Sequence, residues 1–83
     1  MEKVKVYGAD WCGPTQRVKM QLDDLGVEYD YIDVEQDQAA SEWVKSQNGG
    51  KEKKPTLDIA GQVLTSPNQR ELEDALRAGN MLS

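Results

Sequence analysis

Residues 3–18 read KVKVYGADWCGPTQRV, and they carry a predicted strand through a single cysteine into a predicted helix. Lys3–Tyr7 alternates polar and apolar residues, which is the period of a β-strand. Gly8–Gly13 resembles a turn, and Pro14 suits the first position of a helix because the N–H that it lacks would have no partner there. Cys12 is therefore expected at a corner between a strand and a helix.

The chain that follows this corner continues with a helical pattern and then a strand pattern. Val18, Leu22 and Leu25 recur at helical spacing, and Gly26 is typical of the residue that ends such a helix. Val27–Val34 is rich in β-branched residues and tyrosines, so we expect it to form a second strand.

The second half of the chain predicts one more helix, a hairpin of two strands and a final helix. Asp37 is expected to cap the first of these helices, and Asn48–Gly50 to end it. Ser66 is expected to cap the last helix, with Pro67 as its first residue and Gln69 completing a capping box. The other expected features are strands at Thr56–Ile59 and Gln62–Leu64 around a turn at Ala60-Gly61, an apolar helix face of Ala40, Trp43 and Val44, and a second apolar face of Leu72, Ala75 and Leu76 on the last helix, which ends at Gly79.

The order β-α-β-α-β-β-α defines the fold class. Two strands joined through a helix are expected to be parallel with a right-handed crossover, whereas two strands joined by a tight turn form an antiparallel hairpin. We therefore expect an α/β protein with a four-stranded mixed sheet, flanked by three helices that cover both faces. A chain of 83 residues has room for one core, so residues 1–83 are expected to form a single domain.

Composition excludes several classes of function. Hydrophobic residues make up 37% and charged residues 30% of the chain, which is typical of a globular domain rather than a disordered one. Apolar runs never exceed two residues, which excludes a membrane span and the apolar stretch of a signal peptide. Histidine is absent, so no imidazole base and no imidazole-ligated zinc site can form. The single cysteine, Cys12, excludes an internal disulfide, and an unpaired thiol fits the cytoplasm.

The charge is uneven along the chain. The net charge is −5, which argues against binding to nucleic acid. Residues 45–54 nevertheless carry Lys45, Lys51, Lys53 and Lys54 against a single glutamate. This basic segment is either a solvated loop or a patch that steers anions toward the protein.

The position of Cys12 favours thiol chemistry. The first backbone N–H groups of a helix have no partners within the helix, and together with the helix dipole they stabilise an anion such as a thiolate. Arg17 and Lys19 add positive charge one to two turns further on, whereas Asp10 opposes them. A thiolate stabilised in this way is also a good leaving group when its own disulfide is attacked. The alternative is an inert, buried thiol.

Five segments of the chain have the order and spacing of glutaredoxins: Tyr7-Gly8, Trp11–Thr15, Asn48–Gly50, Pro55-Thr56 and Leu64–Pro67. The resemblance covers roughly residues 3 to 78 and is closest to the mycoredoxin-like bacterial branch. It implies a thioredoxin fold and thiol–disulfide exchange that uses a low-molecular-weight thiol, glutathione or mycothiol, as co-substrate, with no tightly bound cofactor. The partners it implies are this small thiol and protein disulfides or S-thiolated proteins, with no nucleic acid, no membrane and a monomeric chain.

The resemblance also implies roles for particular residues. Cys12 is the nucleophile, and Thr15 stands where dithiol members have a second cysteine; its hydroxyl is expected to hydrogen-bond the Cys12 thiolate. Pro55 corresponds to a cis-proline that faces the cysteine, which leaves the N–H and C=O of Lys54 to pair with the thiol. Residues implied to bind the substrate thiol are Trp11, Pro14, Arg17, Lys53, Lys54, Pro55, Thr65 and Ser66, the last two at a helix start that receives a carboxylate.

Two departures from the family leave alternatives open. The site reads Cys-Gly-Pro-Thr rather than the Cys-Gly-Phe-Ser of monothiol members, and Lys53-Lys54 precedes the proline where the family usually has Thr-Val. The leading interpretation is a monothiol oxidoreductase. The alternatives are a protein that bridges a [2Fe–2S] cluster between two protomers, with Cys12 as its metal ligand, and a redox-inactive binding module of the same fold.

Overall fold

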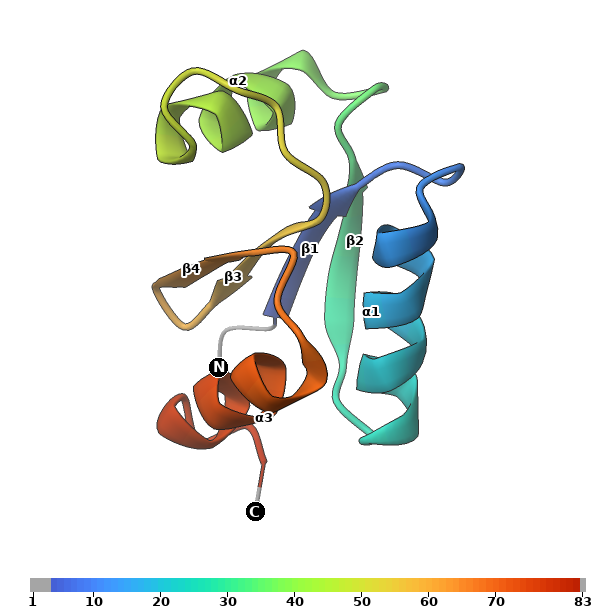
Figure 1. The fold of residues 1–83 in the computed structure, drawn as a ribbon, viewed down its shortest axis with the longest axis vertical. Helices are drawn as coiled ribbons and strands as arrows, with labels where there is room; N and C mark the ends of the chain where they lie inside the picture. Colours follow the sequence, from blue (N-terminus) through green and yellow to red (C-terminus); the bar gives the residue numbers. More distant parts are fainter. Residues whose placement is uncertain (1–3, 83) are drawn as a thin grey trace.

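The computed structural model describes residues 4–82 and contains seven elements in the predicted order (Figure 1). Lys3, the first residue of the expected strand, lies outside the described part. The second strand is shorter than expected and omits Val27 and Val34. The elements are β1 (Val4–Gly8), α1 (Gly13–Asp24), β2 (Tyr29–Asp33), α2 (Gln38–Gln47), β3 (Thr56–Ile59), β4 (Gln62–Thr65) and α3 (Gln69–Ala78).

The four strands form one mixed sheet in the order β2-β1-β3-β4. Strands β1 and β2 are parallel, with Val6 opposite Tyr31. Strand β3 runs antiparallel to β1 and places Leu57 opposite the same valine, and β4 returns antiparallel to β3 as the outer arm of a hairpin. The predicted strand pairing is confirmed.

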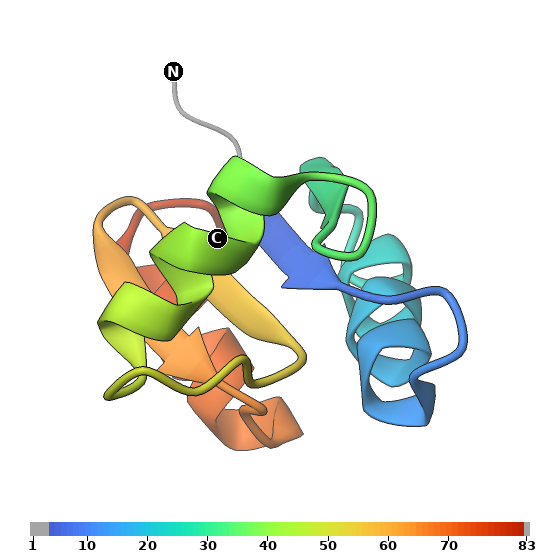
Figure 2. The same ribbon diagram turned by 90° about the horizontal axis from the view of Figure 1, so that it is seen from above.

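The helices cover opposite faces of the sheet. Helices α1 and α3 share one face, while α2 lies across the sheet from them, as the two views show (Figures 1 and 2). On the α2 face, Trp43 packs against Tyr7 with ring centroids 4.6 Å apart. The core on the other face consists of Val4, Val6, Val18, Leu22, Leu57, Ile59, Leu72, Ala75 and Leu76.

Two of the three helices begin and end where the sequence predicts. Asp37 caps α2, because its side chain accepts a hydrogen bond from the N–H of Ala40 at 3.0 Å. Helix α1 ends at Asp24, two residues before Gly26, which has a φ of +71°, a value that glycine adopts without strain.

The predicted start of the last helix is wrong by two residues. Asn68, not Ser66, is the N-cap of α3, and a capping box joins it to Glu71. Asn68 has the extended backbone that an N-cap requires, whereas Ser66 has a φ of +45°. The N–H of Ser66 donates instead to the carbonyl of Pro55 at 2.8 Å, which turns the chain before the helix begins.

No helix among residues 4–82 is long and apolar enough to span a membrane.

Candidate functional site

Cys12 occupies the N-cap position of α1. Its backbone is extended, with φ −82° and ψ 114°, and its carbonyl accepts the first helical hydrogen bond, from the N–H of Gln16. The Cys12 side chain makes no capping hydrogen bond, and the first turn of the helix contains no acidic residue. The free N–H groups at the start of α1 are therefore available to an anion at the position of the thiol.

Cys12 is a largely buried residue, of which only 8% is accessible. The reason is the segment Lys54–Pro55, which lies against the thiol and places the carbonyl oxygen of Lys54 3.9 Å from the Cys12 sulfur, at the limit for a weak S–H hydrogen bond.

Lys54 and Pro55 connect Cys12 to the start of the last helix. The peptide bond between them is cis, as predicted, and Pro55 is buried. The Lys54 carbonyl, which we expected to be available to a ligand, accepts the Ser66 hydroxyl at 3.3 Å as well as the thiol. The Lys54 N–H makes no backbone hydrogen bond within residues 4–82. The structure thus brings together Cys12, Pro55 and Ser66 around one carbonyl.

Trp11 lies on the surface beside Cys12, with 68% of the residue exposed. Its indole N–H donates to Glu35 at 2.8 Å, and the Lys54 ammonium lies 5.0 Å from the centre of its ring. Lys54 also pairs with Glu52, at 3.7 Å. Sequence reasoning missed both glutamates, because the contacts join loops that are distant in sequence and no local pattern signals them.

Thr15 does not make the hydrogen bond that we expected. The residue is fully buried, and its hydroxyl oxygen has no hydrogen-bond partner among the described residues, so it is not bonded to the thiol of Cys12. Its side chain faces Gly8 at the end of β1 instead. A Cβ at Gly8 would overlap the Thr15 methyl group and lie 2.6 Å from its hydroxyl oxygen. Gly8 therefore sets how closely α1 approaches β1.

The remaining predicted site residues are Pro14, Arg17, Lys53 and Thr65. Pro14 and Arg17 are exposed on the first turns of α1, and Lys53 is exposed beside the buried proline. The Thr65 hydroxyl donates to the Asn48 side chain at 2.7 Å, which links β4 to the end of α2. Their exposure leaves Pro14, Arg17 and Lys53 accessible to a ligand.

A tyrosine supports the loop before Cys12. The hydroxyl of Tyr31 donates to Asp10 at 2.8 Å, and the ammonium of Lys19 lies 4.1 Å from the centre of the same ring. Burial, followed by the hydrogen bond to Asp10, raises the pKa of Tyr31 far above its usual value. The tyrosine hydroxyl therefore stays protonated and holds Asp10, the residue preceding Trp11.

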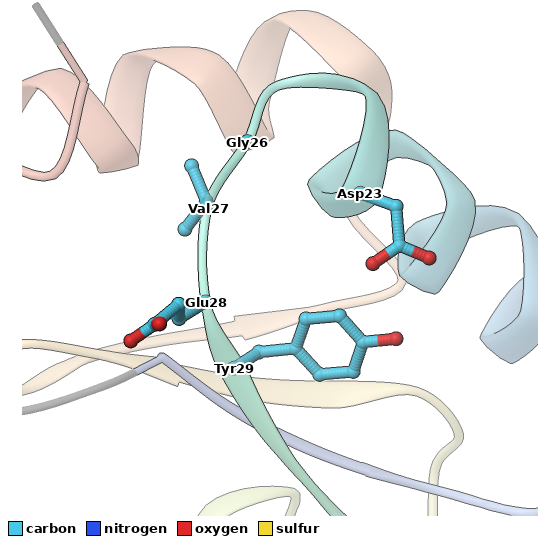
Figure 3. A pocket seen from close by; sticks show the side chains of 5 residues that line it. All are labelled: Asp23, Gly26, Val27, Glu28 and Tyr29. Atoms are coloured by element: carbon cyan, nitrogen blue, oxygen red, sulfur yellow. The ribbon is translucent and has the colours of Figure 1, made fainter.

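One pocket lies away from this centre, at the other end of α1 (Figure 3). It has a volume of about 420 Å³ and is lined by Asp23, Gly26, Val27, Glu28 and Tyr29. Asp23 lies 11 positions after Cys12 along α1, which separates the backbones of the two residues by about 16 Å. Among residues 4–82, no group of three or more cysteine, aspartate or glutamate side chains is placed to hold a metal ion.

Comparisons with known proteins agree on one family. The family model described as Glutaredoxin matches residues 4–64. Mycoredoxin 1 of Corynebacterium glutamicum is 42% identical over 73 residues, which cover 87% of this chain and 90% of the relative. The thioredoxin-like protein BC3987 is 30% identical, with a TM-score of 0.79 over 89% of this chain and all of that chain. A buckwheat glutaredoxin–glutathione complex, 22% identical, shares the fold with a TM-score of 0.75 over 96% of this chain and 81% of that one. The architecture is a thioredoxin fold, as the sequence resemblance implied.

Proposed function

The chain belongs to the glutaredoxin family, and from this premise we propose that it reduces mixed disulfides between proteins and a low-molecular-weight thiol, with Cys12 as its single nucleophile. The observation that carries the proposal is the position of Cys12 at an N-cap that no side chain occupies, beside Lys54–Pro55. A thiolate there accepts stabilisation from free N–H groups and the helix dipole.

The reaction has two exchange steps. First, the Cys12 thiolate attacks the small-thiol sulfur of the mixed disulfide, a new disulfide forms between Cys12 and the small thiol, and the protein sulfur leaves as a thiolate and takes up a proton. A second small-thiol molecule, as its thiolate, then attacks the sulfur of the adduct that belongs to the small thiol. Cys12 leaves as a thiolate, and the two small thiols depart joined as one disulfide. Over the two steps the small thiols are therefore oxidised by two electrons, which reduce the mixed disulfide.

The helix start contributes most to the second step. A stabilised thiolate is more abundant but a weaker nucleophile, so these two effects on attack nearly cancel, whereas its advantage as a leaving group has no such opposing effect. The adduct of Cys12 is then resolved quickly because Cys12 is the sulfur that leaves. Because Thr15 has no thiol, Cys12 cannot form an internal disulfide with this position, and no such disulfide competes with the small thiol.

Two kinds of groups near Cys12 are proposed to bind the small thiol: groups that contact the thiol close to its sulfur, and a cation that pairs with a carboxylate of the thiol. The groups proposed to contact the adduct are Trp11, the Lys54 N–H, Pro55 and Ser66, which adjoin either Cys12 in the chain or the Lys54 carbonyl against its sulfur. A carboxylate of the thiol, where it has one, is proposed to bind the exposed Lys53. We do not assign it to the start of α3, because the capping box already uses the N–H groups of Asn68 and Glu71 and places the Glu71 carboxylate there.

The co-substrate is a small thiol such as mycothiol or glutathione. One relative is named as a mycoredoxin, and a protein of similar fold was solved with glutathione, which supports this class of ligand for the present chain. The chain is proposed to act as a monomer in the cytoplasm, where a single unpaired thiol remains reduced.

The experiment is the reduction of an S-thiolated protein with the corresponding small thiol in excess. The parent protein is expected to catalyse release of the small thiol, and Cys12→Ser to lose this activity to the level of the uncatalysed reaction. Equal rates for the two proteins would contradict the proposal. An absorbance spectrum of the freshly purified protein tests the [2Fe–2S] alternative. A brown protein with absorbance bands in the visible range would favour cluster binding over thiol–disulfide exchange as its function.

A further inference from the structure

The side chain of Lys54 is unusual in its surroundings. Only 17% of it is exposed, although lysine is among the residues that burial disfavours most. Its ammonium lies over the ring of Trp11, and its carbonyl lies against the thiol of Cys12. One residue of the Lys54–Pro55 segment therefore contacts two successive residues of the opposite loop, through its backbone and through its side chain.

Both ends of this contact are held by acidic residues. Glu52 pairs with the Lys54 ammonium at 3.7 Å, and Glu35 accepts the indole N–H of Trp11 at 2.8 Å. The indole ring and the ammonium thus each have an acidic partner in addition to their mutual contact. A cation above the face of a tryptophan ring is attracted by the ring's electron density, so the contact between the Lys54 ammonium and the Trp11 ring stabilises the position of the Lys54 side chain over that ring.

We infer that the Lys54 side chain, drawn over Trp11 and held there by Glu52, is a specificity-determining strap that limits by size which disulfides reach Cys12. This inference rests on the proposed function, since it concerns access to the same nucleophile. The backbone of Lys54 already lies against the Cys12 sulfur, which belongs to a residue only 8% exposed, and the Lys54 side chain extends this cover to the ring of Trp11, the residue before Cys12. A small reagent reaches the sulfur beside the strap, whereas a bulky disulfide has to displace the ammonium from the ring.

The lysine itself is what makes the strap. A short apolar side chain at position 54 would leave the backbone carbonyl against Cys12 but would not reach the ring of Trp11. The neighbouring Lys51 and Lys53 are exposed, so they do not form a comparable cover. The chemistry that the strap selects is therefore a compact disulfide, or one with a carboxylate that can draw the ammonium away from the ring.

The test compares two neutral reagents on the purified protein. The Cys12 thiolate attacks a sulfur of 2,2′-dithiodipyridine and releases pyridine-2-thione, which is followed by its absorbance. Iodoacetamide, which is smaller, alkylates the same thiolate with loss of iodide. Both reactions need the thiolate, so the ratio of their rate constants reports access for a bulky disulfide and not the fraction of ionised thiol.

Lys54→Ala is expected to raise this ratio two- to fivefold over the parent, which corresponds to about 0.4–1 kcal/mol at 1.4 kcal/mol per tenfold. Lys51→Ala, in the same loop, is the matched control and leaves the ratio unchanged. Trp11→Ala removes the other partner of this contact and is expected to raise the ratio in the same way. The double variant, Lys54→Ala with Trp11→Ala, should have a ratio close to that of either single variant, because all three variants lose the same contact.

An unchanged ratio in Lys54→Ala would overturn the strap, and if both rate constants change by the same factor the lysine acts on the reactivity of the thiolate instead. Additive effects in the double variant would also contradict it, because they mean that the two side chains act separately. None of these outcomes bears on whether the protein reduces S-thiolated substrates, so the failure of this inference and that of the proposed function are distinguishable.

Discussion

The starts of α1 and α3 are two helix N-termini in one small protein, and they are built in opposite ways. At α3, Asn68 and Glu71 satisfy each other's backbone N–H groups, and an acidic side chain lies in the first turn. At α1, Cys12 holds the corresponding position without a capping bond, and the first turn carries no acid. The start of α3 therefore has a side-chain cap, whereas the start of α1 has none and carries a thiol at its N-cap.

This difference shows how a helix start becomes reactive. A capping box stabilises its helix but uses the N–H groups that would bind an anion. The start of α1 lacks that stabilisation, so its position depends on packing, above all on Thr15 against Gly8. Each of the following predictions changes one of the two helix starts or the groups around it.

The largest effect on stability is expected at the open helix start. Gly8→Ala places a methyl group against Thr15, whose side chain is fully buried and cannot move aside, so overpacking is expected to lower the free energy of unfolding by about 1–3 kcal/mol. Chemical denaturation measures this change. Thr15→Ala removes the atoms that clash, so the Gly8→Ala change made in that background should cost at least about 1 kcal/mol less than in the parent. Equal costs in both backgrounds would show that this contact does not position α1.

The capped start is tested by a pair of substitutions. Asn68→Ala is expected to lower the free energy of unfolding by about 1 kcal/mol, since it removes the capping bond to Glu71. Ser66→Ala, two residues earlier, is expected to cost about 0.5 kcal/mol or less. Thermal or urea unfolding of the two variants distinguishes them. A larger loss in Ser66→Ala would mean that the helix is capped where the sequence first suggested.

Thr15 and Thr56 are both fully buried, but only Thr56 has partners for its hydroxyl. Thr15→Val replaces an unpartnered hydroxyl with a methyl group and is expected to raise the free energy of unfolding by about 1 kcal/mol. Thr56→Val, the matched control, is expected to lower it by about 1 kcal/mol because two hydrogen bonds are lost. Destabilisation of similar size in both variants would indicate that the Thr15 hydroxyl has a partner in solution.

The smallest effect concerns charge near the open helix start. Lys53→Ala is expected to slow adduct formation with oxidised glutathione by up to about fivefold at low salt, because an exposed charge pair contributes only about 0.2–1 kcal/mol. The difference should shrink at high salt, since exposed charges are screened over about 8–10 Å. The neutral 2,2′-dithiodipyridine is the control and should react equally with both proteins. An effect that persists at high salt would contradict a role through charge.

The elements of the fold were predictable because their signals are local. Hydrophobic period, the Asp37 cap and Gly26 each act within one turn of chain, and the structure confirms the elements they indicate. The start of α3 was predicted wrongly for a physical reason. Ser66 and Asn68 both have side chains that cap helices, and the choice between them depends on the hydrogen bond from Ser66 to Pro55, which lies 11 residues earlier.

The site was predictable only in part, for the same reason. Cys12 and Pro55 carry strong local signals, and both lie where the resemblance implied. The burial of Cys12, the packing of Thr15 on Gly8, and the contacts of Lys54 with Trp11 arise from segments joined by the tertiary fold. No periodicity or capping rule contains such information.

The central claim, that Cys12 alone carries the exchange, is tested most directly by intact-mass measurement after exposure to the oxidised form of the small thiol. The parent protein is expected to gain the mass of one thiol per chain, to return to its original mass when the reduced thiol is added in excess, and Cys12→Ser to gain nothing. A parent protein that gains no mass, or a Cys12 adduct that excess thiol leaves intact, would contradict the claim.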